Sequence, residues 1–151
     1  MRKLLLAPLV MVCLAAVGCV PSPKSGKGFT LPEGDVERGL ATYLSLQCNA
    51  CHSLPDVEPS TTEAQPGEML VALGGEVPRI QTYGELVTAI INPSHRLASG
   101  YRTDAISVDG ESKMKNYNEV MTIAQLADLV TFLQSKYTLE PYEPSPYPPY
   151  Y

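Results

Sequence analysis

Five consecutive residues carry the clearest chemistry in this chain: Cys48, Asn49, Ala50, Cys51 and His52. Two thiols three residues apart lie on one face of a helical turn, so both sulfurs can approach the same edge of a flat ligand. Each thiol can add to one vinyl group of a haem, and an imidazole directly after them can then bind the iron. The motif predicts one covalently attached haem c, with Cys48 and Cys51 as thioether links and His52 as the proximal iron ligand.

Three other interpretations compete for the same residues. A thioredoxin-like redox pair needs a βαβ context, and no alternating, strand-like run precedes Cys48. A structural zinc site needs four ligands, and besides the motif only His95 remains in the chain that follows the predicted export signal. A plain disulfide between Cys48 and Cys51 leaves His52 unexplained. Haem attachment is favoured because it uses all three side chains.

The best candidate for the distal iron ligand is Met114, which lies between Lys113 and Lys115 in a polar, turn-rich segment. An apolar thioether between two lysines is unusual for a core position, but it suits a methionine that points into a haem crevice. A Met thioether opposite His is common in electron-transfer haem and raises the reduction potential. His95, just after a predicted helix end, is the alternative ligand. Met69 and Met121 are rival candidates. We expect Met121 to pack in the core.

Residues 1–18 have the pattern of an export signal, with a basic start, an apolar run from Leu4 to Val17 and small residues before Cys19. The run from Ala16 to Cys19 resembles a bacterial lipobox, in which the cysteine is lipidated and becomes the first residue of the mature protein. Ala16 departs from the commonest residue of that pattern, and an ordinary cleaved signal is the alternative. A lipid on Cys19 would hold the protein at a membrane surface without spanning the membrane.

The rest of the chain is organised around one domain. We expect a flexible tether over residues 19–33, a folded domain over 34–138 and an extended tail, rich in Pro and Tyr, over 139–151. The net charge is −5, and without the 2 basic residues of the signal it becomes −7, from 9 basic and 16 acidic residues. This charge argues against nucleic acid as a partner and permits electrostatic docking with a redox protein that has a basic surface.

Apolar spacing and capping residues predict three helices. The first begins after Asp35 and runs into the motif, and the second lies between Thr82 and Asn92. The third begins after Thr122 and places Leu126, Leu129, Val130, Leu133 and Tyr137 on one stripe, with Asp128 facing away. Gly39 is costly inside a helix, so we expect it to allow a close crossing of the first and third helices.

The segment from Ser53 to Arg79 is rich in Pro and Gly and is predicted to be irregular, apart from a short helical turn over residues 69–73. A carbonyl from Pro55, Pro59 or Pro66 is expected to orient the His52 ring, because a metal-bound imidazole usually donates its second N–H to such a group.

These features together resemble the class I monohaem cytochromes c over residues 34–137. The matching features are Gly39 and Tyr43 before the motif, the run from Leu86 to Asn92-Pro93, the loop to Met114, and the final helix. The resemblance implies an all-α fold, a small cytochrome c with three or more helices and long loops around one haem. It also implies His52 and Met114 as axial ligands. Lys115 departs from the Pro that often follows the ligand Met in that family, and residues 53–81 have no sharp match.

The expected function is that of an electron carrier rather than an enzyme: a lipid-anchored, single-haem c-type cytochrome outside the cytoplasmic membrane, at the periplasmic or cell-surface side. With both axial positions filled, the iron would have no vacant site for a substrate. Two alternatives remain. The chain is a fixed cytochrome subunit of a respiratory or substrate-oxidising complex, or it is a haem sensor or small peroxidase with an open distal position.

Overall fold

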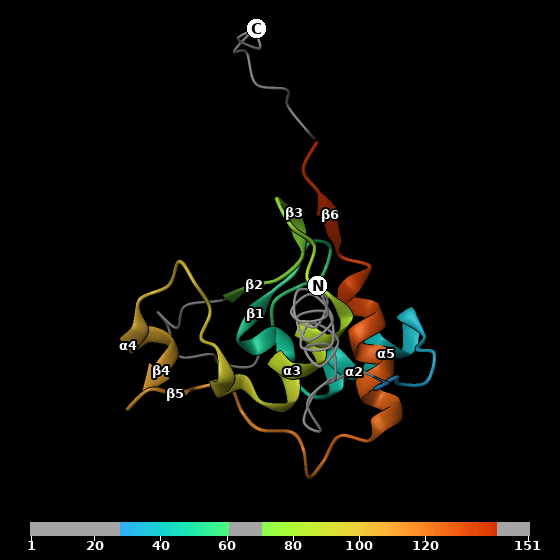
Figure 1. Cartoon of the computed structure of the whole chain (residues 1–151), viewed down its shortest axis with the longest axis horizontal. Helices are drawn as coiled ribbons and strands as arrows, with labels where there is room; N and C mark the ends of the chain where they lie inside the picture. The colour runs from blue at the N-terminus through green and yellow to red at the C-terminus, as the bar shows by residue number, and fades with distance from the viewer. Residues whose placement is uncertain (1–27, 61–70, 142–151) are drawn as a thin grey trace, which may run out of the picture. The chain divides into compact units, whose positions relative to one another are not determined.

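The computed structural model describes residues 28–60 and 71–141 (Figure 1). The chain divides into two units, Met1–Thr30 and Leu31–Tyr151, and every element below belongs to the second. The predicted export signal, Cys19 and Met69 lie outside the described residues, as does the tail from residue 142. Among the helices of the described part, none combines the length and the apolar character that crossing a membrane requires.

The three predicted helices are present with the predicted caps. They are α2 (Val36–Ser45), α3 (Tyr83–Ile91) and α5 (Ile123–Gln134). The Asp35 side chain accepts from the Arg38 amide at the start of α2. Thr82 with Glu85, and Thr122 with Gln125, form complete capping boxes at the other two helices. A fourth, single-turn helix, α4 (Thr103–Ile106), precedes Met114.

The prediction of an all-α fold is wrong, because three strand pairs make the described part of the protein a mixed α/β structure. Two pairs are parallel and one is antiparallel: β1 (His52–Ser53) with β2 (Val71–Ala72), β3 (Gly75–Val77) with β6 (Tyr137–Leu139), and β4 (Ser107–Val108) with β5 (Glu111–Ser112). Strands of two or three residues are too short to show the alternation by which a strand is recognised in a sequence. The parallel pairs also join segments that are far apart in the chain.

Two local predictions are wrong because the residues concerned pair with distant parts of the chain as short strands. Residues 71–72 form β2 instead of belonging to a helical turn. Tyr137 opens β6 instead of extending the stripe of α5, which ends at Gln134. Gly74, just before β3, lies against the turn between α5 and β6: its φ is +70°, and an added Cβ would be only 2.8 Å from the Lys136 carbonyl oxygen. Only glycine fits this close approach without strain.

The antiparallel pair is a tight hairpin that leads directly to Met114. Its turn residues, Asp109 and Gly110, both have positive φ values, 52° and 84°. This is the combination that a two-residue hairpin turn requires, and Asp-Gly is a preferred pair for it. The hairpin and α4 extend to one side of the helical part in Figure 1.

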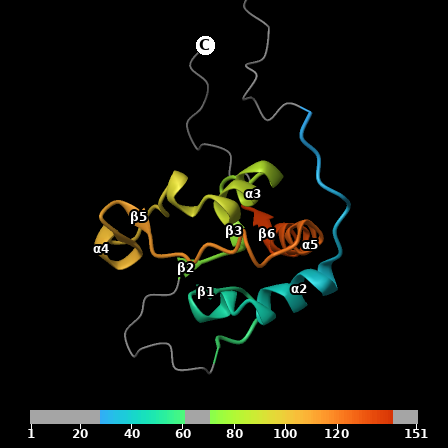
Figure 2. The same cartoon turned by 90° about the horizontal axis from the view of Figure 1, so that it is seen from below.

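The core lies between α5 and the other two long helices. Val130 and Phe132 of α5 and Tyr43 of α2 are the largest side chains that are almost completely buried, and Leu86, Val87 and Ile90 contribute from α3. Helices α2 and α5 lie side by side (Figures 1 and 2). A Cβ on Gly39 would be 2.1 Å from the Asp128 carbonyl oxygen and 2.5 Å from the Phe132 Cβ, which confirms the predicted close crossing.

The expectation that Asp128 faces away from the core is wrong. Its side chain is only 8% exposed and accepts two hydrogen bonds of 2.9 Å from the Arg38 guanidinium. It also accepts one of 2.7 Å from the Asp35 amide, at the start of α2. The Arg38 hydrogen bond, followed by that of the Asp35 amide, lowers the pKa of the Asp128 carboxyl. Asp128 therefore ties α5 to the N-terminus of α2 beside the Gly39 crossing.

Candidate haem-attachment site

The motif lies on its own short 3₁₀ turn after α2, Cys48–Ala50 (η2). Gln47 separates the two helices because it adopts a left-handed conformation, with φ 57° and ψ 34°. The Cys51 amide donates to the Cys48 carbonyl over 3.2 Å and so closes the turn. Residues i and i+3 eclipse each other in a 3₁₀ turn, so the two cysteines come to the same side. This is the placement that attachment to one ring requires.

The two thiols have different environments. Cys48 is half-buried and packs against the core, whereas Cys51 is exposed. Burial raises the pKa of the Cys48 thiol to about 11, so this thiol is protonated at neutral pH. A redox-active dithiol needs the opposite, a thiol whose pKa is lowered toward neutrality. The environment of Cys48 therefore favours an anchoring role over thiol and disulfide exchange.

The His52 ring is oriented by a backbone carbonyl of the paired strand. Its Nδ1 atom lies 3.2 Å from the Val71 carbonyl oxygen, across the β1 and β2 pair in which His52 and Val71 are opposite each other. A carbonyl can only accept, so this contact requires Nδ1 to carry the proton, and the neutral ring then presents the lone pair of Nε2. Burial lowers the pKa of His52, while the Val71 carbonyl opposes this shift in part. The result is a neutral imidazole with Nε2 available for a metal.

The acceptor for the His52 ring is Val71 rather than Pro55, Pro59 or Pro66. Pro66 lies outside the described residues, and the contact that the structure shows belongs to Val71. Sequence reasoning missed it because parallel pairing across 19 residues leaves no local pattern. The strand pair therefore has a function: it brings a carbonyl to the imidazole.

Tyr43 connects this site to the crossing of α2 and α5. Its hydroxyl donates to the His52 carbonyl over 2.9 Å, and its ring lies 5.7 Å from that of Phe132 between centroids. Burial, and after it the nearby Cys48, raise the pKa of the Tyr43 phenol, so the hydroxyl keeps its proton. The buried ring positions the backbone of His52 from the core side.

Met114 is half-buried and lies two residues after the end of β5. Its amide donates to the Ser112 hydroxyl over 3.2 Å. The core cluster and the half-buried residues packed on it, taken over the described residues, include Met121 but not Met114. Met121 is thus placed as expected for a packing residue, and Met114 is an apolar side chain that the core does not use.

The segment that carries Met114 meets the motif through Tyr117. The Tyr117 hydroxyl donates over 3.0 Å to the carbonyl of Leu46, two residues before Cys48. Burial first, and then the charges of Cys48 and Cys51, raise the pKa of Tyr117. Sequence reasoning treated Tyr117 only as part of a turn and missed this contact.

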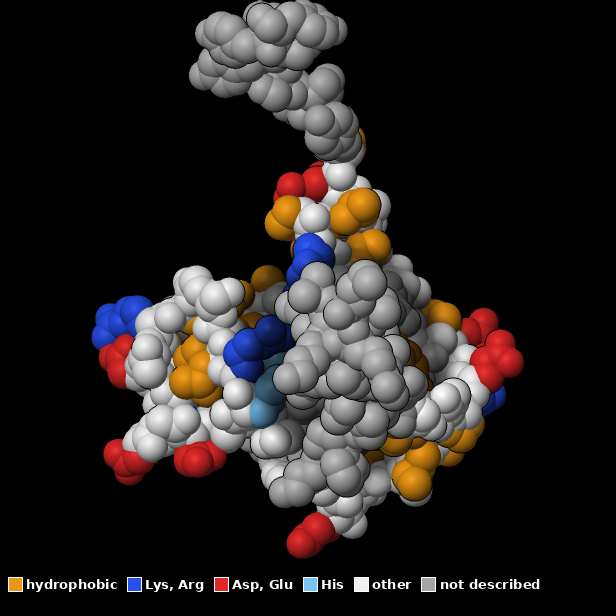
Figure 3. Space-filling view, viewed as in Figure 1, with side chains coloured by type: hydrophobic (Ala, Val, Ile, Leu, Met, Phe, Trp, Pro, Cys, Tyr) orange, Lys and Arg blue, Asp and Glu red, His pale blue; other side chains and the backbone are white. Residues whose placement is uncertain are grey.

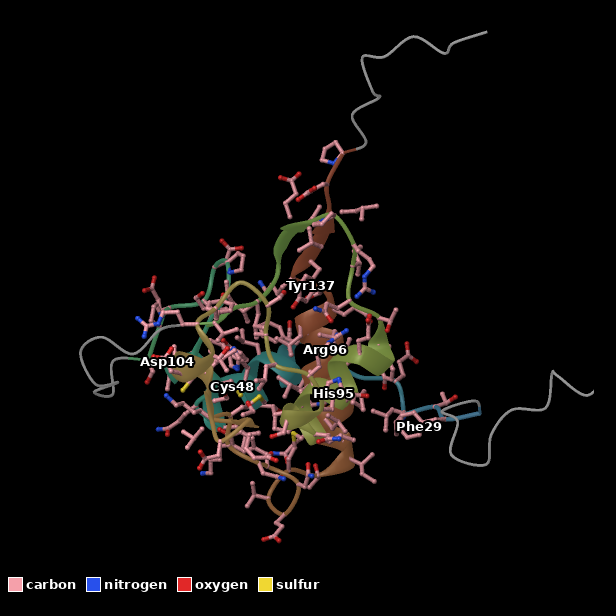
Figure 4. All side chains as sticks on the ribbon, turned by 60° about the vertical axis from the view of Figure 1, so that its left-hand side comes forward. Phe29, Cys48, His95, Arg96, Asp104 and Tyr137 are labelled. Carbon is pink, nitrogen blue, oxygen red and sulfur yellow. The ribbon has the colours of Figure 1, made fainter. Side chains whose placement is uncertain are left out.

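His95, the alternative distal ligand, lies on a 3₁₀ turn after α3, Pro93–His95 (η3). It is exposed, and its Nδ1 atom lies 2.8 Å from the Asn92 carbonyl oxygen. Figure 4 labels it beside Arg96. The neighbouring Ser94 hydroxyl accepts from the Ser112 amide over 3.0 Å, so the chain segments of His95 and Met114 are joined. The structure therefore brings both candidates to one region and leaves His95 the more exposed of the two.

The described residues contain no group of three or more His, Cys, Asp or Glu side chains that could hold a metal ion. Cys48, Cys51 and His52 are close in sequence, but they do not converge on a single point as zinc ligands do. Two thiols on one side of a turn, followed by a neutral and oriented imidazole, instead fit a large flat ligand that is attached at its edge and coordinated at its centre.

Comparison with known proteins gives no relative for this chain. No protein-family model matches it, and no curated protein or solved structure matches it significantly.

Proposed function

We propose that this protein is an exported, single-haem c-type cytochrome that is held at a membrane by a lipid on Cys19 and carries electrons outside the cytoplasmic membrane. One observation carries the proposal: a 3₁₀ turn presents Cys48 and Cys51, and the next residue, His52, has a desolvated ring whose Nδ1 is directed at the Val71 carbonyl. When bound, haem c supplies a one-electron Fe(III)/Fe(II) couple. Export and lipidation rest on the pattern of residues 1–19 alone.

In this proposal the chain's own residues hold the haem and set the reduction potential of its iron. Cys48 and Cys51 bind it covalently, so it does not dissociate when the iron changes charge. His52 binds the iron through Nε2, and the Val71 carbonyl fixes the tautomer and orientation of the ring and makes the imidazole a stronger donor. Tyr43 restrains the His52 backbone from the core. None of these residues provides acid, base or nucleophilic chemistry toward a substrate.

Met114 is proposed as the distal ligand. Its support is indirect: it is half-buried, it is not part of the core cluster, and its segment is bonded to Leu46 through Tyr117. A thioether opposite His52 would raise the potential and close the iron to external ligands. Membership of the class I cytochromes c remains a proposal that rests on the motif and the Gly39 crossing. The three strand pairs depart from the all-α form of that family.

The negative net charge of the chain is compatible with a protein as the partner. Acidic side chains lie mainly around the edge of the face shown in Figure 3, and basic ones include a group near its middle. The net charge of −5, or −7 without the signal, opposes binding to nucleic acid. We propose a redox partner with a basic docking surface, because opposite charge accelerates the encounter of electron-transfer proteins.

A fixed place in a larger oxidoreductase complex is the second candidate. The observation that favours it is exposed apolar surface: Val120, in the turn before α5, and Ile123, the first residue of α5, are 64% and 65% exposed. Purification of the full-length protein in mild detergent separates the two cases. Recovery with partners in fixed stoichiometry supports a subunit, and recovery alone supports a carrier.

Spectroscopy of the purified protein tests the carrier assignment. We expect the ferric protein to show the far-red absorbance band of Met-ligated haem and the ferrous protein to bind carbon monoxide poorly. A titration should give a single one-electron couple. Rapid binding of carbon monoxide, together with absence of the far-red band, would instead identify a sensor or a small peroxidase.

A further inference from the structure

Tyr117 joins three parts of the protein that the proposed site needs together. Its hydroxyl donates to the Leu46 carbonyl over 3.0 Å, at the end of α2. Its own carbonyl accepts from the amides of Val120 and Met121, at 3.0 Å and 2.8 Å, in the turn that leads to α5. Met114 lies three residues before it. Tyr117 is thus the point where the Met114 segment, the motif and the approach to α5 meet.

The segment that precedes Tyr117 is held mainly by contacts within its own part of the chain. The Lys113 amide donates to the Ile106 carbonyl, and the Lys113 ammonium donates to the Asp104 carbonyl. The Met114 amide donates to Ser112. These bonds order α4 and the hairpin, but they do not fix the distance between Met114 and the cysteines.

The Ser112 amide donates to the Ser94 hydroxyl in η3, and two further side-chain hydrogen bonds extend from this region to the ends of the long helices. The Asn118 amide donates to the Ile91 carbonyl over 2.8 Å, at the end of α3, and Tyr117 donates to Leu46. Of these two, the Tyr117 bond reaches the chain that carries the motif, two residues before Cys48. The stiffness of this contact comes from the ring, because Tyr has only two side-chain torsions between its backbone and its hydroxyl.

The environment of the Tyr117 hydroxyl keeps it a donor. The side chain is half-buried, and the Lys115 ammonium lies 5.5 Å from the centre of its ring. Burial, followed by the nearby Cys48 and Cys51, raises the pKa of the phenol, so it stays protonated across the physiological range. A backbone carbonyl is always an acceptor, so the bond does not depend on pH or on the state of a partner side chain.

We propose that Tyr117 is a positioning residue for the distal side of the site: its hydroxyl fastens the segment of Met114 to Leu46 and so sets the distance of Met114 from the haem-attachment turn. This inference rests on the proposed function, in which Met114 binds the iron. Tyr117 itself touches neither the iron nor a substrate.

Tyr117→Phe in the full-length, haem-loaded protein tests the inference, because it removes the hydroxyl and keeps the ring. We expect the far-red band of Met ligation to weaken and binding of carbon monoxide to the ferrous protein to become faster. Hydrogen exchange at the Val120 and Met121 amides should rise about three- to tenfold, the range that corresponds to loss of one hydrogen bond. Exchange at the Leu73 amide, which donates to the carbonyl of Ser53 in β1, should not change.

Tyr137→Phe is the matched control. It makes the same chemical change at a tyrosine in β6 whose ring packs on the core, and it should leave both the far-red band and carbon monoxide binding as in the wild type. A purely structural role of Tyr117 would raise exchange at Val120 and Met121 but leave the band unchanged, which would overturn the inference. Wild-type exchange and a wild-type band in Tyr117→Phe would overturn it as well.

Failure of the proposed function gives a different result. In that case the wild-type protein itself carries no covalent haem and has no far-red band. If the wild-type protein has the band and Tyr117→Phe keeps it in full, the proposed function stands and only the role of Tyr117 is refuted.

Discussion

Substitution of Gly39 by Ala should destabilise the protein, although the same change usually strengthens a helix. An added Cβ would lie 2.1 Å from the Asp128 carbonyl oxygen and 2.5 Å from the Phe132 Cβ, whereas ordinary contacts begin at 3.4 Å. The nearest atom is backbone of α5 and cannot rotate away. To relieve the overlap, α5 would have to move away from α2 by about 1 Å, because packed helices behave as rigid bodies.

The expected magnitude follows from three terms. Overpacking in a well-packed core costs about 1–3 kcal/mol. Separation of α2 and α5 also weakens the packing of Tyr43 on Phe132 and the hydrogen bonds from Arg38 to Asp128, which adds about 1 kcal/mol to the loss. Against these, Ala gains about 1 kcal/mol over Gly in a helix. We therefore expect a net loss of about 2 kcal/mol in the free energy of unfolding.

Gly84→Ala is the matched control, since Gly84 lies in α3 and a Cβ there would meet nothing within 4 Å. This variant should be more stable than the wild type by about 0.5 kcal/mol. Urea unfolding followed by far-ultraviolet circular dichroism measures both variants in the same background. A Gly39→Ala protein that is as stable as the wild type, or more stable, would refute the close crossing.

Three further predictions concern the helix contact and the site. The pKa of the Asp128 carboxyl is lower in the folded state than its ordinary value of 3.8. Its hydrogen bonds therefore stabilise the protein fully above pH 3.8, and this contribution is lost as the pH falls through the lower pKa of the folded state. The difference in unfolding free energy between the wild type and Asp128→Asn should thus be largest near neutral pH and shrink below pH 3.8, and a difference that grows on acidification would contradict the Arg38 contact. Met114→Ala should lower the potential and open the iron to carbon monoxide, whereas Met121→Ala should mainly reduce stability; Met ligation that survives in Met114→Ala would exclude it as the ligand. Cys51→Ala should leave a single thioether through Cys48 and one unsaturated vinyl group on the haem, so its haemochrome band should move to longer wavelength; a band at the wild-type position would argue that Cys51 is not a link.

The sequence was sufficient for features that depend on local patterns. Thr82 and Thr122 begin helices because a Glu or Gln follows three residues later, and both capping boxes are confirmed. The Gly39 crossing followed from one residue that a helix would otherwise avoid, together with an apolar stripe that needed a partner. Such features can be predicted because the residues that determine them lie within one or two helical turns of each other in the sequence.

Features that depend on pairing between distant residues could not be predicted. The Val71 carbonyl reaches His52 through a two-residue strand pair, and neither strand is long enough to show a period. Asp128 occupies a position that helical spacing assigns to solvent, and it is buried because Arg38 and the Asp35 amide satisfy its charge. The Tyr117 bond is a further case, since a turn tyrosine and the end of a helix 71 residues away have no common signature in sequence.

The central claim is that Cys48 and Cys51 carry a covalently bound haem. It is tested most directly by a haemochrome spectrum of the purified full-length protein, combined with the mass of the peptide that contains both cysteines. The account predicts a spectrum of haem whose two vinyl groups are both saturated, and a peptide heavier by one haem. A haem that is extracted by acidified organic solvent, or a peptide with two unmodified cysteines from a protein matured in a host able to attach haem c, would contradict it.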